Sequence, residues 1–185
     1  SAYAGLTFDG VANCFVTTSL ATLPTGSTPG EIWVVGNDTA LNTVACGCGN
    51  NTAGQNRQIG VGGTGNLARV SDKTTSSSGP ASWSSPQIVK GDWSETTMNG
   101  YETGVPFAGN PATIGSLNTG TTRLRIGANA NTSASTFWNG PIRHVMILTG
   151  VLSDAKRQKL EGWLAWDAGL QASLPATHPY RLFRP

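Results

Sequence analysis

Residues 121–185 read TTRLRIGANANTSASTFWNGPIRHVMILTGVLSDAKRQKLEGWLAWDAGLQASLPATHPYRLFRP, and this stretch decides the fold. Charged and apolar side chains alternate with a period of two at 123–127, and an apolar segment follows at 142–148. We expect two adjacent strands there. One α-helix follows at about 153–168, where Ser153 is placed to cap the N-terminus and Gly169 to cap the C-terminus.

Several segments carry a resemblance to a known family. The ending resembles that of concanavalin A-like, laminin-G-like domains in the strings FWNGPI (137–142), VLSDAKR (151–157), LEGWLAWDAGL (160–170) and LPATHPY (174–180). The string LTFDGVAN at 6–13 resembles the opening strand and turn of that family, and TMNGY at 97–101 resembles its central Asn-Gly hairpin. The resemblance implies an all-β, concanavalin A-like jelly-roll sandwich of two antiparallel sheets with one C-terminal α-helix.

The resemblance also implies a setting. Such endings are associated with phage virion proteins, including tail-fibre and capsid-decoration proteins, and with bacterial surface proteins. A location on the virion surface or outside the cell is therefore expected. Proteins that share a fold differ in their ligands, so the function has to be argued from the residues.

The composition predicts one β-rich domain over residues 1–185. The chain has 24 glycines, and residues rich in Ser, Thr and Asn separate short alternating segments, which is typical of a sandwich. We expect strands at 3–9, 12–18, 30–36, 42–48, 57–62, 66–71, 86–91, 95–98, 101–105, 123–128 and 141–148, with loops at 73–85, 108–122 and 128–136.

Charge and hydropathy exclude two classes of partner. Only 12% of the residues are charged, the net charge is +2, and the basic residues are scattered, so we expect no nucleic acid ligand. No apolar run approaches the roughly 20 residues that a membrane-spanning helix needs, so we expect no membrane partner.

Catalytic patterns are missing from the sequence. Glucanases of the resembled fold place two carboxylates two residues apart on one strand, because glycoside cleavage needs an acid and a base or nucleophile at one bond. Here Asp92 and Glu95 are the nearest pair, and their spacing would direct them to opposite faces of a strand. No Gly-x-Ser-x-Gly motif presents a serine. We therefore expect no enzyme and keep a glycan-active hydrolase only as a second alternative.

Binding is the favoured class. Sugars are recognised by aromatic faces together with amide or carboxylate groups, and such residues fall in or beside the expected loops. The candidate ligand-binding residues are Trp83, Asp92, Trp93, Tyr101, Asn129, Asn131 and Trp138. Each has a simpler role open to it, since a Trp at a sandwich edge can be packing and an Asn can serve a turn.

Two functions stay open at this point. The chain is either a module that binds host glycans through its edge loops, or a structural capsid-decoration or fibre-assembly protein that contacts neighbouring virion proteins and forms homo-oligomers. An open, aromatic-lined groove would favour the glycan, whereas a flat apolar patch would favour assembly.

Metal and cofactor sites are not expected. Asp9 with Asn13, and Asn37 with Asp38, supply oxygens that suit calcium, but neither pair has the dense acidic spacing of a dedicated loop, and turns explain both. Cys46 and Cys48 would share a strand face, yet the chain has only two histidines to complete a zinc site.

Overall fold

The computed structural model describes residues 5–18, 22–50, 52, 54–63, 65–72, 74–131 and 133–185. The strands are β1 (Leu6–Asp9), β2 (Phe15–Thr17), β3 (Gly30–Gly36), β4 (Val44–Gly49), β5 (Asn56–Gly62), β6 (Leu67–Ser71), β7 (Ser76–Ser82), β8 (Gln87–Trp93), β9 (Thr97–Glu102), β10 (Val105–Pro106), β11 (Ala112–Thr113), β12 (Arg123–Ile126) and β13 (Asn139–Thr149). Helix α1 covers Asp154–Ala168, and a 3-10 turn, η1, covers Gln171–Ser173. Residues 3 and 4 of the expected strand 3–9 lie outside the described residues.

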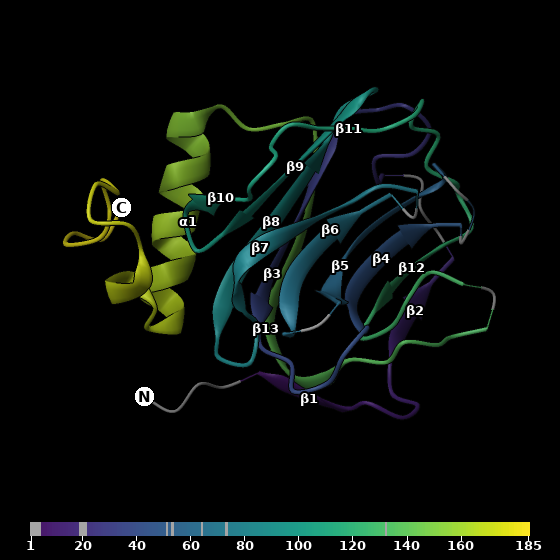
Figure 1. Ribbon diagram of the computed structural model, residues 1–185, viewed down its shortest axis with the longest axis horizontal. Coiled ribbons are helices and arrows are strands. Elements are labelled where there is room, and N and C mark those ends of the chain that lie inside the picture. Colours follow the sequence, from purple (N-terminus) through teal and green to yellow (C-terminus); the bar gives the residue numbers. More distant parts are fainter. Residues whose placement is uncertain are drawn as a thin grey trace.

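The strands form two antiparallel sheets. Sheet A has the order β1-β13-β3-β8-β9-β10, with β11 paired to β9, and sheet B has the order β2-β12-β4-β5-β6-β7. Figure 1 shows the sheets face to face, with α1 outside sheet A. The predicted all-β sandwich with one C-terminal helix is confirmed.

The core lies between the sheets. Ile32 and Val34 of β3 face Ile59 of β5 and Val70 of β6, and each of these side chains is at most 1% exposed. The β3 segment 30–36 is buried along its whole length, as its apolar sequence predicts for a central strand covered on both faces.

A second apolar layer joins α1 to the outer face of sheet A. Trp33, Val35 and Ile88 point away from the core because alternate strand residues face opposite sides. They pack against Leu164 and Ala165 of the helix. Sheet A is therefore covered on both faces, whereas no helix of the described chain lies on the outer face of sheet B (Figure 1).

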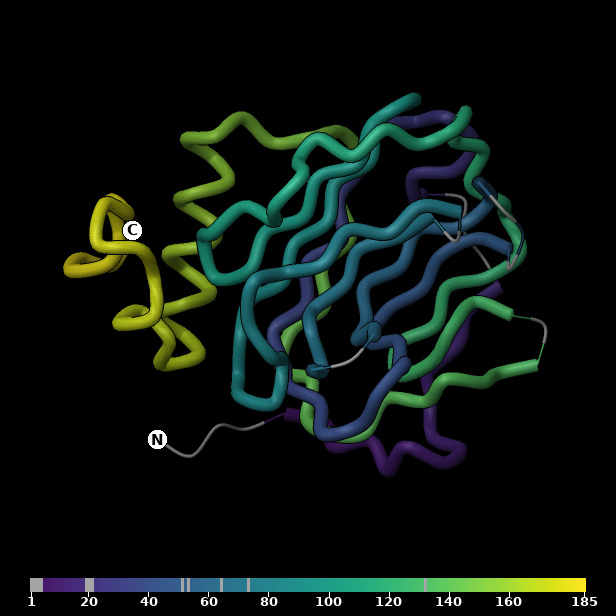
Figure 2. Tube along the Cα trace, in the orientation of Figure 1, coloured from purple at the N-terminus to yellow at the C-terminus, as the bar shows by residue number. Residues whose placement is uncertain are grey.

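The predicted ends of the helix are confirmed. Ser153 is the N-cap residue, with extended backbone, although its side chain makes no capping bond. Gly169 adopts the left-handed conformation at φ 74°, and the Leu170 N–H donates to the Ala165 carbonyl at 2.7 Å. The tail then folds back alongside α1 (Figure 2), where Trp166 Nε1 donates to the Tyr180 carbonyl at 2.9 Å.

The expected pairing of 123–127 with 142–148 is wrong. The first segment is β12 in sheet B, paired with β2 and β4, and the second is β13 in sheet A, paired with β1 and β3. The intervening residues cross from one sheet to the other, as in a jelly roll. Arg125 of β12 is only 7% exposed, although arginine side chains are mostly exposed in proteins.

The expected Asn99-Gly100 hairpin is also wrong. Both residues lie inside β9, and the chain reverses at Thr103 and Gly104, which have φ of 45° and 85°. Gly100 is needed for space: a Cβ there would lie 2.2 Å from the Phe107 ring. Packing, not a turn, therefore accounts for this glycine.

One expected loop contains a strand. Residues 76–82 form β7 at the edge of sheet B, although Ser, Gly and Pro are poor strand formers. An edge strand tolerates them because it has one neighbour and little to pack. Ser77 and Gly79 face inward, while Ser76 and Ser78 are exposed.

Candidate functional site

The structure places three predicted ligand residues in the core. Trp83, Trp93 and Trp138 are 0% exposed. Trp83 and Trp138 meet edge to face, and Trp83 Nε1 donates to the Gly36 carbonyl at 2.6 Å. None of these rings presents a face to a ligand outside the sandwich, so packing, the simpler role, is the one the structure gives them.

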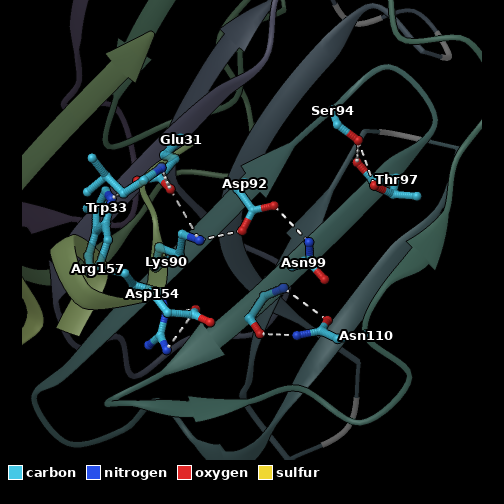
Figure 3. Close-up of polar contacts among 12 residues, drawn as sticks. Glu31, Trp33, Lys90, Asp92, Ser94, Thr97, Asn99, Asn110, Asp154 and Arg157 are labelled. Carbon is cyan, nitrogen blue, oxygen red and sulfur yellow. Dashed lines mark hydrogen bonds and ion pairs between the residues drawn. The ribbon is translucent and has the colours of Figure 1, made fainter. Parts of the chain in front are cut away.

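Asp92 belongs to a polar network between sheet A and α1 (Figure 3), and the Tyr101 ring lies beside two cations of that region. Lys90 lies 3.3 Å from the Glu31 carboxylate and forms a second ion pair with Asp92. Asn99 Nδ2 donates to Asp92 at 2.8 Å. Two cations lie within cation–π distance of the Tyr101 ring: Lys90 Nζ is 4.7 Å from its centroid and the Arg157 guanidinium carbon is 4.5 Å away.

This network serves to hold the helix. Glu31, which is 0% exposed, accepts hydrogen bonds from Trp33 Nε1 at 2.8 Å and from the Leu152 N–H at 2.9 Å. Each buried charge in it has an opposite charge or a donor, which is the condition for burying charges at an acceptable cost. Asp92 itself is 5% exposed, and its carboxylate is engaged within sheet A by Lys90 and Asn99.

Asn129 and Asn131 lie in the segment that borders sheet B. The Asn129 side chain accepts from the Ser135 N–H at 3.1 Å and donates to the Ser135 hydroxyl at 2.7 Å, which closes the loop on itself. The segment covers Gly47, where a Cβ would lie 3.0 Å from the Ala130 nitrogen. Gly47 pairs with Gln58 of β5, so this loop flanks the outer face of sheet B.

The two calcium candidates are turns. Asp9 Oδ1 accepts from the N–H groups of Val11, Ala12 and Asn13, and the Val11 bond is the main cause that lowers the pKa of Asp9. Asp38 accepts from the Ala40 N–H at 2.7 Å and the Thr43 hydroxyl, while burial raises its pKa. The described residues contain no group of three or more His, Cys, Asp or Glu side chains arranged for a metal.

The cysteines are free thiols in or near the core. Cys46 and Cys48 are buried, and they share the inward face of β4 as their spacing predicts. Burial raises the pKa of Cys46, and it raises the pKa of Cys48 to about 11. Burial therefore disfavours the thiolate form that a cysteine nucleophile uses.

The outer face of sheet B carries a polar pocket. It has a volume of 210 Å³ and is lined by Gln58, Arg69, Ser71, Thr74, Thr75 and Ser76. Register explains the grouping: Gln58 pairs with Ser71, and Ser71 pairs with Ser76, so three neighbouring strands place polar side chains in one row on one face. None of the described residues that line this pocket carries a carboxylate.

A tight turn forms one wall of the pocket. Asp72 Oδ1 accepts from the N–H groups of Thr74 and Thr75 at 2.8 and 2.6 Å, which fixes the turn and turns both threonines toward the pocket lining. The neighbouring Ser71 is 3% exposed, and its hydroxyl oxygen has no hydrogen-bond partner among the described residues. A buried hydroxyl without a partner is costly, and a bound polar group would satisfy it.

Arg69 supplies the charge on this face. Its side chain lies across Gly62, where a Cβ would come within 2.9 Å of Cδ, Nε and Nη1. It forms no hydrogen bond or ion pair with a residue that the structure describes, and burial lowers its pKa. An unpaired, half-buried guanidinium has donors in a fixed plane and is free to bind acceptor groups of a ligand.

Two other hollows are larger and apolar. One, of 380 Å³, lies beside α1, and one, of 280 Å³, lies at the edge formed by β1 and β2. A sugar presents hydroxyl groups that need donors and acceptors, so the smaller polar pocket is the better candidate site for it despite its size.

The sequence contains a signal for this site that a search for aromatic residues in loops does not detect. The segments Gln58-x-Gly60-x-Gly62 and Arg69-x-Ser71 alternate with apolar residues inside strands that the sequence did predict. Such alternation places polar and small side chains together on one uncovered face. Ser76 could not be found in this way, because β7 itself was expected to be a loop.

Comparison with known proteins identifies the fold. No family model matches the chain, and no curated protein matches it. Among solved structures, the CBM40 of Ruminococcus gnavus IT-sialidase is 14% identical, with a TM-score of 0.60 over 83% of this chain and 92% of that one. The same module bound to α2,3-sialyllactose gives a TM-score of 0.62.

The other similar structures include a pentraxin and whole sialidases. The heptameric SAP-like pentraxin of Limulus polyphemus is 14% identical, with a TM-score of 0.60 over 84% of this chain and 80% of that one. A Trypanosoma rangeli sialidase is 18% identical, with a TM-score of 0.58, but the match covers only 28% of its chain. The fold is a concanavalin A-like jelly-roll sandwich. At these identities the likeness establishes the fold alone.

Proposed function

We propose that this chain is a non-enzymatic glycan-binding domain whose binding surface is the outer face of sheet B. The observation that carries the proposal is the polar pocket of Gln58, Arg69, Ser71, Thr74, Thr75 and Ser76, which holds an unpaired guanidinium and an unpartnered hydroxyl. The CBM40 of Ruminococcus gnavus IT-sialidase, which shares this fold over 92% of its own length, is a carbohydrate-binding module. That likeness supports the proposal.

The size of the pocket suits a small part of a glycan. Its 210 Å³ fall below the roughly 300–1,000 Å³ of pockets that enclose drug-sized ligands. We therefore infer that it takes a terminal sugar or one substituent, while further residues of the glycan extend over the exposed side chains of β7, Ser76 and Ser78. Of the seven ligand-binding residues predicted from the sequence, Asn129 and Asn131 alone border this surface, and they lie at its flank.

The absence of carboxylates from the pocket lining supports a binding role over hydrolysis. Glycoside cleavage by the usual route requires two carboxyl groups at the scissile bond. Three other acidic residues of the two sheets are unavailable to a glycan, because each is at most 5% exposed and faces α1 or the core. They are Glu31, Asp92 and Glu102. We propose that incubation with β-glucans, galactans and host polysaccharides releases no reducing ends above background.

A glycan array probed with the wild-type protein tests the proposed function, followed by affinity measurements on the strongest ligand. Gln58→Ala and Ser71→Ala each remove a hydrogen-bonding group, so each should weaken binding by roughly three- to tenfold. Ser76→Trp should block the pocket. Trp163→Ala, on the opposite side of the molecule, is the control. Affinity that none of the three pocket variants changes would reject this site.

The setting of the domain is a separate proposal. The resemblance of the C-terminal segments supports a phage tail-fibre, capsid-decoration or bacterial surface protein, and hence a virion-surface or extracellular location with residues 1–185 as one domain. Within the described residues, no helix is long and apolar enough to cross a membrane. Sequencing the native gene, to see whether it joins this chain to a fibre stalk, tests the proposal.

One observation favours assembly as a second candidate function. Leu6 of edge strand β1 and Phe15 and Val16 of edge strand β2 are 61%, 54% and 56% exposed. Exposed apolar edge strands favour pairing with another chain. If this edge forms homo-oligomers, Phe15→Ser with Val16→Thr should convert an oligomer to a monomer in light scattering, whereas a wild-type monomer at high concentration would exclude it.

A further inference from the structure

An apolar groove lies beside α1, on the side of the molecule away from sheet B. Its floor is formed by Leu148 at the end of β13 and by Leu152, Leu160 and Trp163. Lys156 and Lys159 line the same groove and are exposed. Residues 156 and 160, like residues 159 and 163, are four positions apart along the helix, and all four share one flank of α1. That flank therefore presents two lysines next to an apolar strip.

The groove leaves large apolar side chains in water. Trp163 is 41% exposed, although the other flank of α1 is packed against sheet A and the tail. The Trp163 ring lies beside that of His144, with 5.8 Å between the ring centroids, and the outer part of the indole remains exposed. Exposed aromatic area next to a hollow is typical of a surface that another molecule covers.

The charge around the groove is uncompensated. The acids of α1 are all engaged elsewhere: Asp154 and Glu161 pair with Arg157, and Asp167 pairs with Arg143 and His144. Lys156 and Lys159 form no ion pair with a described carboxylate. A ligand that supplies carboxylates at the rim and apolar side chains in the groove would complement this surface.

A second copy of this chain has few free carboxylates to offer. The chain has 10 acidic residues, and six of them are buried: Glu31, Asp38, Asp72, Asp92, Glu102 and Glu161. Asp154 and Asp167 are in ion pairs, and Asp9 accepts three backbone N–H groups. Among the described residues Glu95 is then the one exposed acid without such an engagement, and a single carboxylate does not match two lysines.

We propose that this groove docks an acidic amphipathic segment of a different protein, with apolar side chains on Leu152, Leu160 and Trp163 and carboxylates at Lys156 and Lys159. Helix-in-groove binding of this kind uses apolar anchors three and four residues apart. Because the groove and the glycan pocket lie on opposite sides of the sandwich, the domain holds both ligands at once. The proposal does not depend on the glycan-binding function.

The probes are three synthetic peptides of about 16 residues that contain the same apolar residues. The first carries Leu and Trp at helical spacing with Glu on the flanks, the second replaces each Glu with Lys, and the third scrambles the anchors of the first. Fluorescence anisotropy gives the affinity for the full chain, and amide chemical-shift changes locate the contact. We expect the acidic peptide to bind at least tenfold more tightly than either control, with shifts confined to α1 and the end of β13.

Charge variants separate docking from general attraction. Lys156→Gln with Lys159→Gln should weaken the acidic peptide about tenfold, while Arg69→Gln on sheet B should leave its affinity unchanged. Lys156→Glu with Lys159→Glu should reverse the preference toward the basic peptide. Trp163→Ala should weaken the acidic peptide while the variant stays folded, because the side chain is 41% exposed and is not one of the buried residues that join α1 to sheet A.

Three results would overturn the proposal. Equal affinity for acidic and basic peptides would show that the lysines do not select the ligand. Concentration-dependent self-association that Trp163→Ala abolishes would assign the groove to a second copy. Binding to phosphatidylserine vesicles without binding to the acidic peptide would assign it to a lipid surface. Each result leaves the glycan-binding proposal standing, since that surface is tested by different variants.

Discussion

The ammonium group of Lys90 lies 3.3 Å from the carboxylate of Glu31 in a place where neither side chain is more than 2% exposed. A second carboxylate, that of Asp92, shares the same ammonium group. This lysine therefore neutralises two acids that sheet A places side by side beneath α1, and the seating of the helix depends on it.

Lys90→Met should destabilise the protein strongly. The change keeps the apolar stem but leaves the Glu31 and Asp92 carboxylates buried next to each other without a cation, which costs about 3–5 kcal/mol in comparable pairs. Urea unfolding followed by fluorescence measures the free energy. Lys159→Met, at an exposed position, is the control and should change it by less than about 0.5 kcal/mol. Equal effects would show that the pair does not hold α1.

Stability should fall as the pH rises from about 5 to about 8 because of Glu102. Burial raises the pKa of this carboxyl group to about 7, and the side chain faces Gly79 and Phe107 in the core. The folded state then keeps a proton that the unfolded state releases near its ordinary pKa, so stability is full below about 4.3 and is lost as the pH passes the folded pKa.

Glu102→Gln should remove this part of the pH dependence. Between pH 5 and pH 8 the wild type should lose on the order of 2 kcal/mol more unfolding free energy than the variant does. Urea titrations at the two pH values measure it, with exposed Glu95→Gln as the reference. A constant difference would mean that Glu102 is ionised in the folded protein.

Gly100→Ala should destabilise the sandwich. The added Cβ would meet the Phe107 ring at 2.2 Å, and overpacking of a core typically costs 1–3 kcal/mol. Gly115→Ala is the matched control, because no atom lies within 4 Å of its Cβ. Thermal unfolding should show a lower melting temperature for the first variant only. Similar curves for both would mean that Phe107 moves aside freely.

Gly62→Ala should weaken glycan binding without unfolding the domain. Its Cβ would occupy the space of Arg69 Cδ, Nε and Nη1, and this flexible side chain can swing away. The guanidinium would then lose the position from which it donates to a ligand, and we expect about a tenfold loss of affinity, as for a charge-assisted hydrogen bond. Isothermal titration with the best ligand from the array checks this. An unchanged affinity would exclude Arg69 from the site.

Local signals in the sequence predicted the helix and the central strand. Ser153 and Gly169 mark the ends of α1 because caps depend on the residues beside them, and the apolar run of β3 requires cover on both faces. The sheet to which a strand belongs depends instead on distant partners. That is why β12 and β13 were expected side by side although they belong to opposite sheets.

The candidate site was harder to predict for a different reason. Trp93 and Trp138 lie near strand ends, where a ligand-binding and a core aromatic have the same sequence context. Strand parity does carry information: Val89, Gly91 and Trp93 alternate with Lys90 and Asp92. The polar residues of that strand face α1, though, so parity alone would not have revealed that the helix covers them.

The uneven cover of the two sheets affects how this protein can change over evolutionary time. Outward positions of β3 and β8 in sheet A, such as Trp33 and Ile88, pack against α1, so a substitution there must preserve the contacts that seat the helix. Outward positions on sheet B, such as Gln58, Ser76 and Ser78, have no such obligation, and surface substitutions of this kind usually alter stability by less than about 0.5 kcal/mol. Related chains can therefore diversify what they recognise on sheet B while keeping the same scaffold, and a library for new specificities is best randomised on that sheet.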